Sequence, residues 1–122
     1  MKFEFENQEI DYSEFNIKYT RIIEKKESEK FIEITLEEPD PIGDLIQFYV
    51  GKSGSNFIIC DDGDTMFLLD PCQKNVNKKI KINEILKKYN IYNTEYYGLT
   101  LKTDNLHAGI FNFIAALKEL YV

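Results

Sequence analysis

Apolar and polar residues alternate along much of the first half of the chain, and this two-residue period is typical of β-strands with one buried face. The alternation predicts four strands, at Ile17–Glu24, Phe31–Leu36, Leu45–Val50 and Phe57–Cys60. A further alternation of phenylalanine and glutamate in Met1–Asp11 fits either a short edge strand or a frayed terminal segment.

The segment that follows Asp11 carries two competing signals. Asp11 or Ser13 could cap a short helix through Tyr12 and Phe15. The β-branched and aromatic residues of the string NIKYTRII favour a strand instead. Both alternatives stay open from the sequence.

The connections between the four strands predict antiparallel hairpins. The charged string KKESEK joins the first two strands, and the Gly/Ser-rich segment Gly51–Asn56 is a flexible turn between the third and the fourth. Between these hairpins, Glu37–Asp44 contains two prolines and a glycine, which exclude regular structure there.

Helical spacing becomes more frequent in the second half. After the turn at Asp62-Gly63, Asp64 or Thr65 could cap a short helical turn, with a fifth strand as the alternative. A polar, basic loop follows at Gln73–Lys79, and the apolar spacing beyond it predicts a helix over Asn83–Tyr89 that Asn83 caps.

The last third of the chain predicts a second hairpin and a long helix. The hairpin joins Ile91–Tyr97 to Leu99–Thr103 through a turn near Gly98, and Asp104 or Asn105 caps the helix. The apolar positions of that helix are Leu106, Ile110, Phe111, Phe113, Ile114, Leu117, Leu120 and Tyr121. Most of them follow the spacing of one helical face.

These elements predict an α+β fold: a twisted antiparallel sheet of four to six strands, with the C-terminal helix packed on one face and a second, short helix. The length of 122 residues fits a single domain over residues 1–122. A composition of 43% hydrophobic and 30% charged residues argues against disorder. A chain of this size can build its core without disulfides or a structural metal.

Charge and cysteine content limit the classes of function. The formal net charge of −6 argues against non-specific binding of duplex nucleic acid, which requires a basic surface. No apolar run approaches the length of a membrane span, and the N-terminus does not resemble a signal peptide. Cys60 and Cys72 form no CxxC pair, and we expect them to be free thiols in the cytoplasm.

An acidic cluster is the first candidate for chemistry. Asp40, Asp44, Asp61, Asp62 and Asp64 all fall at predicted strand ends or turns. Pairing across the Gly51–Asn56 turn should bring Asp44 and Asp62 to the same end of a hairpin. The sequence requires no cofactor, but Asp44, Asp61 and Asp62 could hold a divalent cation or act as catalytic acids and bases. The alternative is that these residues only form turns.

Complete catalytic motifs are absent from the sequence. A restriction-type nuclease needs a lysine two residues after its second acid, and Cys60-Asp61-Asp62 is not followed by one. The acidic turn also lacks the regularly spaced Asp/Asn ligands and the closing glutamate of an EF-hand calcium loop. His107 is the only histidine, and the string GKSGS is neither a nucleophile elbow nor a P-loop.

Two groups of residues could bind a partner. Lys78 and Lys79 belong to a basic island that also contains Lys74, Lys81, Lys87 and Lys88. Tyr92, Tyr96 and Tyr97 could form an aromatic protein-binding patch. A solvated helix face and ordinary sheet packing are the respective alternatives.

The middle of the chain resembles a bacterial and phage domain family of unknown function. The resemblance rests on Pro41-Ile42-x-Asp44-x-Ile46-x-Phe48-Tyr49-Val50 and on Ile59-Cys60-Asp61-Asp62-Gly63-Asp64-Thr65. It covers roughly Ile32 to Asn90. The chain departs from the family pattern at Leu36–Pro41, so Asp40 is not carried over. The resemblance implies a phage or mobile-element context and no particular reaction.

Two functions follow as hypotheses. We favour a non-enzymatic protein-binding or regulatory protein of a phage or mobile element, such as an anti-defence factor, because no catalytic set is complete. The partner would be another protein, and a homodimer through exposed hairpin edges is a further option. The alternative is a metal-dependent phosphodiesterase or nuclease built on Asp44, Asp61 and Asp62.

Overall fold

A computed structural model describes residues 1–25, 29–69 and 76–122. The fold is α+β, as predicted, and its main part is a six-stranded antiparallel sheet. The elements of the described residues are β1 (Lys2–Phe5), β2 (Gln8–Asp11), α1 (Tyr12–Phe15), β3 (Ile17–Lys25), β4 (Glu29–Pro39), β5 (Leu45–Ser53), β6 (Asn56–Cys60), α2 (Asp64–Leu69), α3 (Val76–Lys88), β7 (Tyr92–Thr94), β8 (Gly98–Thr103) and α4 (Leu106–Leu120).

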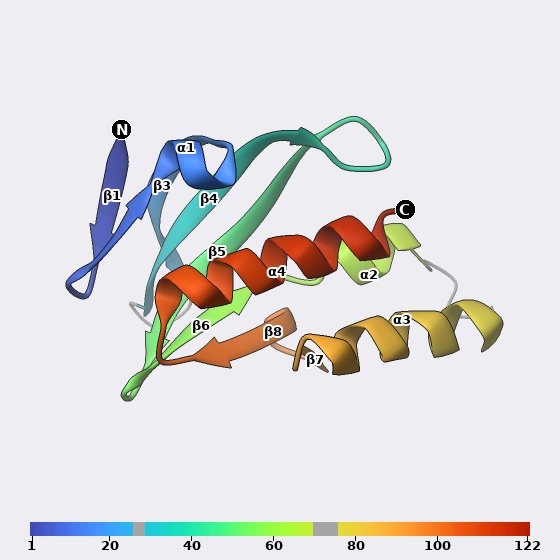
Figure 1. The fold of residues 1–122 in the computed structure, drawn as a ribbon. Helices are drawn as coiled ribbons and strands as arrows, with labels where there is room; N and C mark the ends of the chain where they lie inside the picture. The colour runs from blue at the N-terminus through green and yellow to red at the C-terminus, as the bar shows by residue number, and fades with distance from the viewer. Residues whose placement is uncertain (26–28, 70–75) are drawn as a thin grey trace.

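The strand order of the main sheet is β3-β4-β5-β6-β8-β7, and β1 and β2 form a separate hairpin. Strands β3 to β6 follow one another as hairpins. The chain then leaves the sheet through α2 and α3 and returns with β8 beside β6, which places β7 at the outer edge. Figure 1 shows α4 crossing the sheet, with α3 running beside it.

The main core lies on the face of the sheet that carries the helices, which we call the helix face. One row of paired residues crosses five strands on this face: Ile22, Ile32, Val50, Ile59 and Leu101. Among the described residues, all buried apolar side chains of the helices belong to this core. The alternation seen in the sequence therefore directs one set of side chains towards the helices.

The C-terminal helix packs closely on the helix face because one small residue faces the sheet. A Cβ atom on Gly109 would lie 2.5 Å from Thr103 Cγ2 and 2.9 Å from Ile59 Cδ1. The Asn105 side chain caps the helix and accepts the backbone N–H of Ala108 at 3.1 Å. Phe113 is fully buried, and its ring centroid lies 5.5 Å from that of Phe48.

A smaller apolar cluster occupies the opposite face of the sheet. Phe31, Ile58 and Cys60 are buried there, and Ile23, Tyr49 and Tyr97 pack against them. Phe31 lies directly over Gly51, where a Cβ would come within 2.5 Å of its ring. No helix residue of the described chain contributes to this cluster.

The N-terminal alternatives are resolved by the structure. Met1–Asp11 contains two strands that pair as a hairpin, rather than a frayed segment. The next residues form the short helix α1, capped by the Asp11 carboxylate, which accepts the Ser13 N–H at 3.0 Å. The strand that the string NIKYTRII favours is also present, because β3 begins at Ile17, just after the helix.

Several predicted boundaries are wrong. α3 begins at Val76, so the predicted loop over Gln73–Lys79 is helical from Val76 onward and Asn83 lies inside the helix instead of capping it. Lysine is a good helix former, and the packing of Ile82 and Leu86 on the core fixes the helix. β4 extends to Pro39, which pairs with Leu45 after a register shift. Cys72 and Lys74 lie outside the described residues.

No helix among the described residues combines the length and the apolar character needed to cross a membrane.

Replacing Phe113 with alanine should lower the free energy of unfolding by about 3–5 kcal/mol, because it removes a fully buried ring and leaves a cavity. Phe111, on the same helix, is 62% exposed, and its replacement with alanine should change stability by only about 0.5 kcal/mol. Urea denaturation of both variants measures the difference. Similar losses in the two variants would contradict the described orientation of α4.

Candidate functional site

The acidic turn after β6 is organised by Asp61, which is buried. Its Oδ1 accepts the backbone N–H groups of Gly63 at 2.9 Å and Leu99 at 2.8 Å, and its Oδ2 accepts that of Thr65 at 2.9 Å. The carboxylate thus caps the start of α2, a role that the sequence assigned to Asp64 or Thr65. It also attaches this turn to β8.

The backbones on either side of this carboxylate approach each other closely. The Asp61 N–H donates to Leu99 O at 3.2 Å, and the Asp62 N–H donates to Tyr97 O at 2.9 Å. Gly98 has a φ of +73°, and a Cβ there would fall on the Gly63 nitrogen and lie 2.5 Å from Asp61 Oδ1. Only glycine fits this position, so the junction requires both Asp61 and Gly98.

Asp44 and Asp61 are held by separate backbone contacts. Cys60, the last residue of β6, pairs with Tyr49, so Asp44 lies beyond the paired part of the β5–β6 hairpin. The Asp61 carboxylate bonds to β8 on the other side of β6. Asp62 is exposed and has a φ of 63°.

Asp40 has a local role in the loop before β5. Its Oδ1 accepts the backbone N–H groups of Ile42 at 2.9 Å and Asp44 at 3.1 Å. Within the described residues, no group of three or more His, Cys, Asp or Glu side chains could hold a metal ion. The cation site expected on Asp44, Asp61 and Asp62 gains no support from this geometry.

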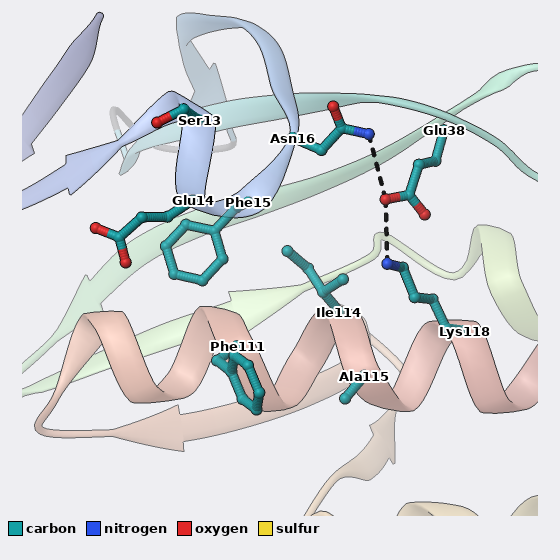
Figure 2. A pocket seen from close by; sticks show the side chains of 9 residues that line it. All are labelled: Ser13, Glu14, Phe15, Asn16, Glu38, Phe111, Ile114, Ala115 and Lys118. Atoms are coloured by element: carbon teal, nitrogen blue, oxygen red, sulfur yellow. Dashed lines mark hydrogen bonds and ion pairs between the residues drawn. The ribbon is translucent and has the colours of Figure 1, made fainter.

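A pocket of about 290 Å³ lies between α1 and α4 (Figure 2). Phe15, Phe111 and Ile114 give it an apolar surface. At its polar end Lys118 Nζ lies 3.1 Å from Glu38 Oε1, which also accepts a hydrogen bond from Asn16 Nδ2 at 3.4 Å. The pocket is large enough for one apolar side chain or a small molecule.

The sole histidine helps to hold α1 beside this pocket. His107 Nε2 lies 2.7 Å from Glu14 Oε2, and its ring contacts Phe15 edge-on with a centroid separation of 5.0 Å. The sequence did not reveal this pocket, because its walls are distant along the chain. One residue does mark the pocket: Phe111 is an apolar residue that lies outside the buried face of α4, and its side chain is 62% exposed.

The face opposite the helices carries a continuous row of paired residues across all six strands. The row runs through Arg21, Glu33, Tyr49, Cys60, Thr100 and Tyr92. Tyr96 and Tyr97 lie beside it in the turn between β7 and β8. We call the surface formed by Tyr49, Tyr92, Tyr96 and Tyr97 the tyrosine face.

Aromatic contacts give the tyrosine face a fixed shape. The rings of Tyr96 and Tyr97 meet edge-on with centroids 4.5 Å apart, and Tyr97 also packs on Phe31 at 5.8 Å. The Tyr97 hydroxyl donates to Glu29 Oε2 at 3.0 Å. Tyr92 and Tyr96 are 44% and 46% exposed, so large parts of both rings are available to a partner.

The electrostatic environment of this face is acidic. Burial, together with the negative charges of Glu33, Asp62 and Asp64, raises the pKa of Tyr49 to about 12. Burial and the hydrogen bond to Glu29 raise the pKa of Tyr97 to about 12. Arg21 contributes a positive charge, but its Nη2 lies 3.1 Å from Glu33 Oε2 and is neutralised there.

The structure separates the two groups of expected partner-binding residues. Lys78 and Lys79 are exposed on α3, which packs on the helix face. Lys78 and Lys81 line a small pocket of about 120 Å³ next to α4. Lys88, farther along the helix, pairs with Glu119 at 3.2 Å. Tyr92, Tyr96 and Tyr97 gather on the other side of the sheet.

A family model matches most of this architecture. The model described as domain of unknown function DUF1828 covers residues 39–119, which is more than half of the chain. The chain belongs to the DUF1828 family. The family matched is one of unknown function, as the sequence resemblance indicated. No curated protein and no solved structure matches the chain.

The matched range includes the central features of this DUF1828 protein. It contains the Asp61–Gly98 junction, all of α4 except its last residue and the tyrosine face from Tyr49 onward. It begins at Pro39, so β1 to β3 and nearly all of β4 precede it. The family assignment therefore covers the junction and the four tyrosines of the tyrosine face, but not the α1 side of the pocket or the N-terminal edge of the sheet.

Replacing Asp61 with asparagine should destabilise this DUF1828 protein by about 2–3 kcal/mol. An amide places an NH₂ group against one of the three N–H donors that the carboxylate now accepts. Asp62→Asn is the matched control and should change stability by only about 0.5 kcal/mol, because asparagine tolerates positive φ. Urea denaturation measures both. Equal stability of the two variants would show that Asp61 does not organise the junction.

Raising the pH should remove a stabilising contribution of Tyr49 and Tyr97. Their pKa values in the fold, about 12, lie above the ordinary 10.0, so the contribution is complete below pH 10.0 and is lost as the pH approaches 12. Tyrosinate absorbance should show a fraction that titrates late in the folded protein and with the other tyrosines in urea; Tyr89 and Tyr121, whose pKa values are also raised, contribute to it. Tyr49→Phe and Tyr97→Phe should each remove one tyrosine from this fraction. A folded protein that titrates like the unfolded chain would contradict this prediction.

Proposed function

We propose that this DUF1828 protein is a non-enzymatic protein-binding module, and that its tyrosine face binds a basic segment of a protein partner. The observation that supports this most strongly is the row of residues from Arg21 to Tyr92, which crosses the sheet on the face without helices. Glu33, Cys60 and Thr100 in this row are buried, so the surface itself is formed by the exposed Tyr92 and Tyr96 and the partly exposed Tyr49 and Tyr97. A surface of this kind needs little ordering when a partner binds.

The residue types on this face are those that supply binding energy in protein interfaces. Tyrosine offers a large apolar ring with a polar hydroxyl and loses little conformational entropy on binding. Tyr92 and Tyr96 present their rings to solvent, while Tyr97 supports Tyr96 from the side. These residues form the centre of the proposed interface.

The charge of the face indicates the chemistry of the partner. Glu29 bonds to Tyr97, and the charges of Glu33, Asp62 and Asp64 act on Tyr49. An arginine or lysine side chain can pair with the exposed Asp62 and Asp64 and lie over a tyrosine ring, whereas Glu33 is buried and already pairs with Arg21. A basic segment therefore fits this surface better than an acidic one, and the net charge of −6 would accelerate its association.

The biological setting of the proposal follows the sequence resemblance. It is a regulatory or anti-defence role in a phage or mobile element, with the cytoplasm as the compartment. No observation favours the alternative of a metal-dependent phosphodiesterase, because the Asp61 carboxylate is engaged by three backbone N–H groups.

Binding of a labelled Arg-Gly repeat peptide, measured by fluorescence anisotropy, tests the proposal. A Glu-Gly repeat of equal length is the control peptide. The basic peptide should bind and the acidic peptide should not, and the affinity should fall with added salt. Tyr92→Ala and Tyr96→Ala should each weaken binding about tenfold, which corresponds to about 1.4 kcal/mol.

Phe111→Ala is the matched control variant, because it removes an exposed aromatic ring on α4, on the other side of the sheet. It should leave the affinity for the basic peptide unchanged. Loss of binding in Phe111→Ala alone, or equal binding of the two peptides, would refute the tyrosine face as the docking surface.

A further inference from the structure

The outer edge of β3 is the longest strand edge that the main sheet leaves open. β3 spans Ile17–Lys25, and within the sheet it pairs only with β4. No backbone hydrogen bond from another described segment reaches the middle of this edge. The opposite edge, β7, is only three residues long. An open edge offers a row of N–H and C=O groups to another strand.

Large apolar side chains are exposed along this edge. Ile22 is 74% exposed, although it is the end member of the apolar row that continues through Ile32, Val50 and Ile59. Tyr19, on the other face of the same strand, is 44% exposed. The core row therefore stops at the sheet edge with an uncovered isoleucine, which a further strand would cover.

We infer that β3 pairs antiparallel with β3 of a second copy of this chain, about a two-fold axis at Arg21. Lys18 lies at the register shift between Ile17 and Tyr19, at the end of the regular part of β3, and this pairing brings it next to Glu24 of the partner subunit; the symmetry repeats this ion pair. The pairing also places Tyr19 opposite the partner's Ile23, and Thr20 opposite the partner's Ile22. Opposite charges face each other at both ends of the paired segment.

The charge at the axis is balanced within each copy. The two Arg21 side chains would meet there, and each guanidinium already lies 3.1 Å from its own Glu33 carboxylate. Like charges opposite each other are otherwise unfavourable, so these two carboxylates are needed for the pairing. The two six-stranded sheets would join into one continuous sheet, and both exposed Ile22 side chains would be covered.

Charge exchange across the axis tests both the dimer and its register. Sedimentation velocity over a wide concentration range should show a reversible dimer for the wild type. Each of the single variants Lys18→Glu and Glu24→Lys places like charges opposite one another at both ends of the paired strands. Each should therefore raise the dimer dissociation constant at least about tenfold. The double variant Lys18→Glu/Glu24→Lys should restore it. Lys79→Glu on α3 makes the same charge change away from the edge and should leave the dimer intact.

Circular dichroism spectra and thermal melting show whether each variant is folded. Both side chains are exposed, so we expect all variants to fold like the wild type. If Glu24→Lys fails to fold, Ile22→Lys takes its place and should give a monomer. A wild type that is monomeric at every concentration overturns the inference, and so does a folded double variant that fails to regain the dimer.

Discussion

The buried carboxylate of Asp61 connects the turn and the start of α2, which follow it directly, to β8, which is distant along the chain. It accepts N–H groups from the turn after β6, from the start of α2 and from β8. A buried charge without such donors would be very unfavourable, so the fold keeps all three segments within hydrogen-bonding distance. The contact extends the pairing of β6 with β8 beyond the end of their ladder and fixes the start of α2 beside β8. Because β8 anchors α4 through a short connection, the position of the C-terminal helix follows from it as well.

This arrangement produces a sheet with two unlike faces. The helices cover one face and bury the apolar rows, while the other face keeps a small apolar cluster bordered by tyrosines and carboxylates. The polar groups on that second face are engaged in structural contacts: Glu33 with Arg21, Glu29 with Tyr97, and Thr35 with Gln47. Such contacts fix the shape of the surface. A surface with a fixed shape and exposed rings suits recognition better than bond-breaking chemistry.

Local sequence signals were sufficient for most elements of the fold. The two-residue alternation predicted β3 to β6, and the spacing of Leu106, Ile110, Phe113 and Leu117 predicted α4, because each pattern repeats over several turns or strand residues. The start of α3 was missed because Val76 to Lys79 offers no buried residue as a local signal. The observed lengths of the helices and strands depend on tertiary packing, which no short segment of the sequence reveals.

The candidate sites were harder to predict because they depend on contacts between distant residues. An Asp-Asp-Gly turn has the same sequence whether its carboxylates bind a cation or backbone N–H groups, and only the position of Leu99 shows which role Asp61 has. The row that aligns Tyr49 with Tyr92 depends on the register of three strand pairs. The tyrosines themselves were identified as partner-binding candidates, but their separation from Lys78 and Lys79 follows from which face each element occupies.

The hydrogen bond between Asp61 and Leu99 also closes a loop, since the two residues are 38 positions apart in the sequence. Both α2 and α3 lie inside this loop, together with β7. The cost of closing a loop rises only slowly with its length, so one hydrogen-bonded junction can close a segment of this size. Leu69, Ile82 and Leu86 within the loop are buried in the main core, so the two helices are an integral part of the fold and not a separable insert. Tyr92, Tyr96 and Tyr97 lie in the same loop, so the junction at Asp61 also closes the segment that carries three of the four residues of the tyrosine face.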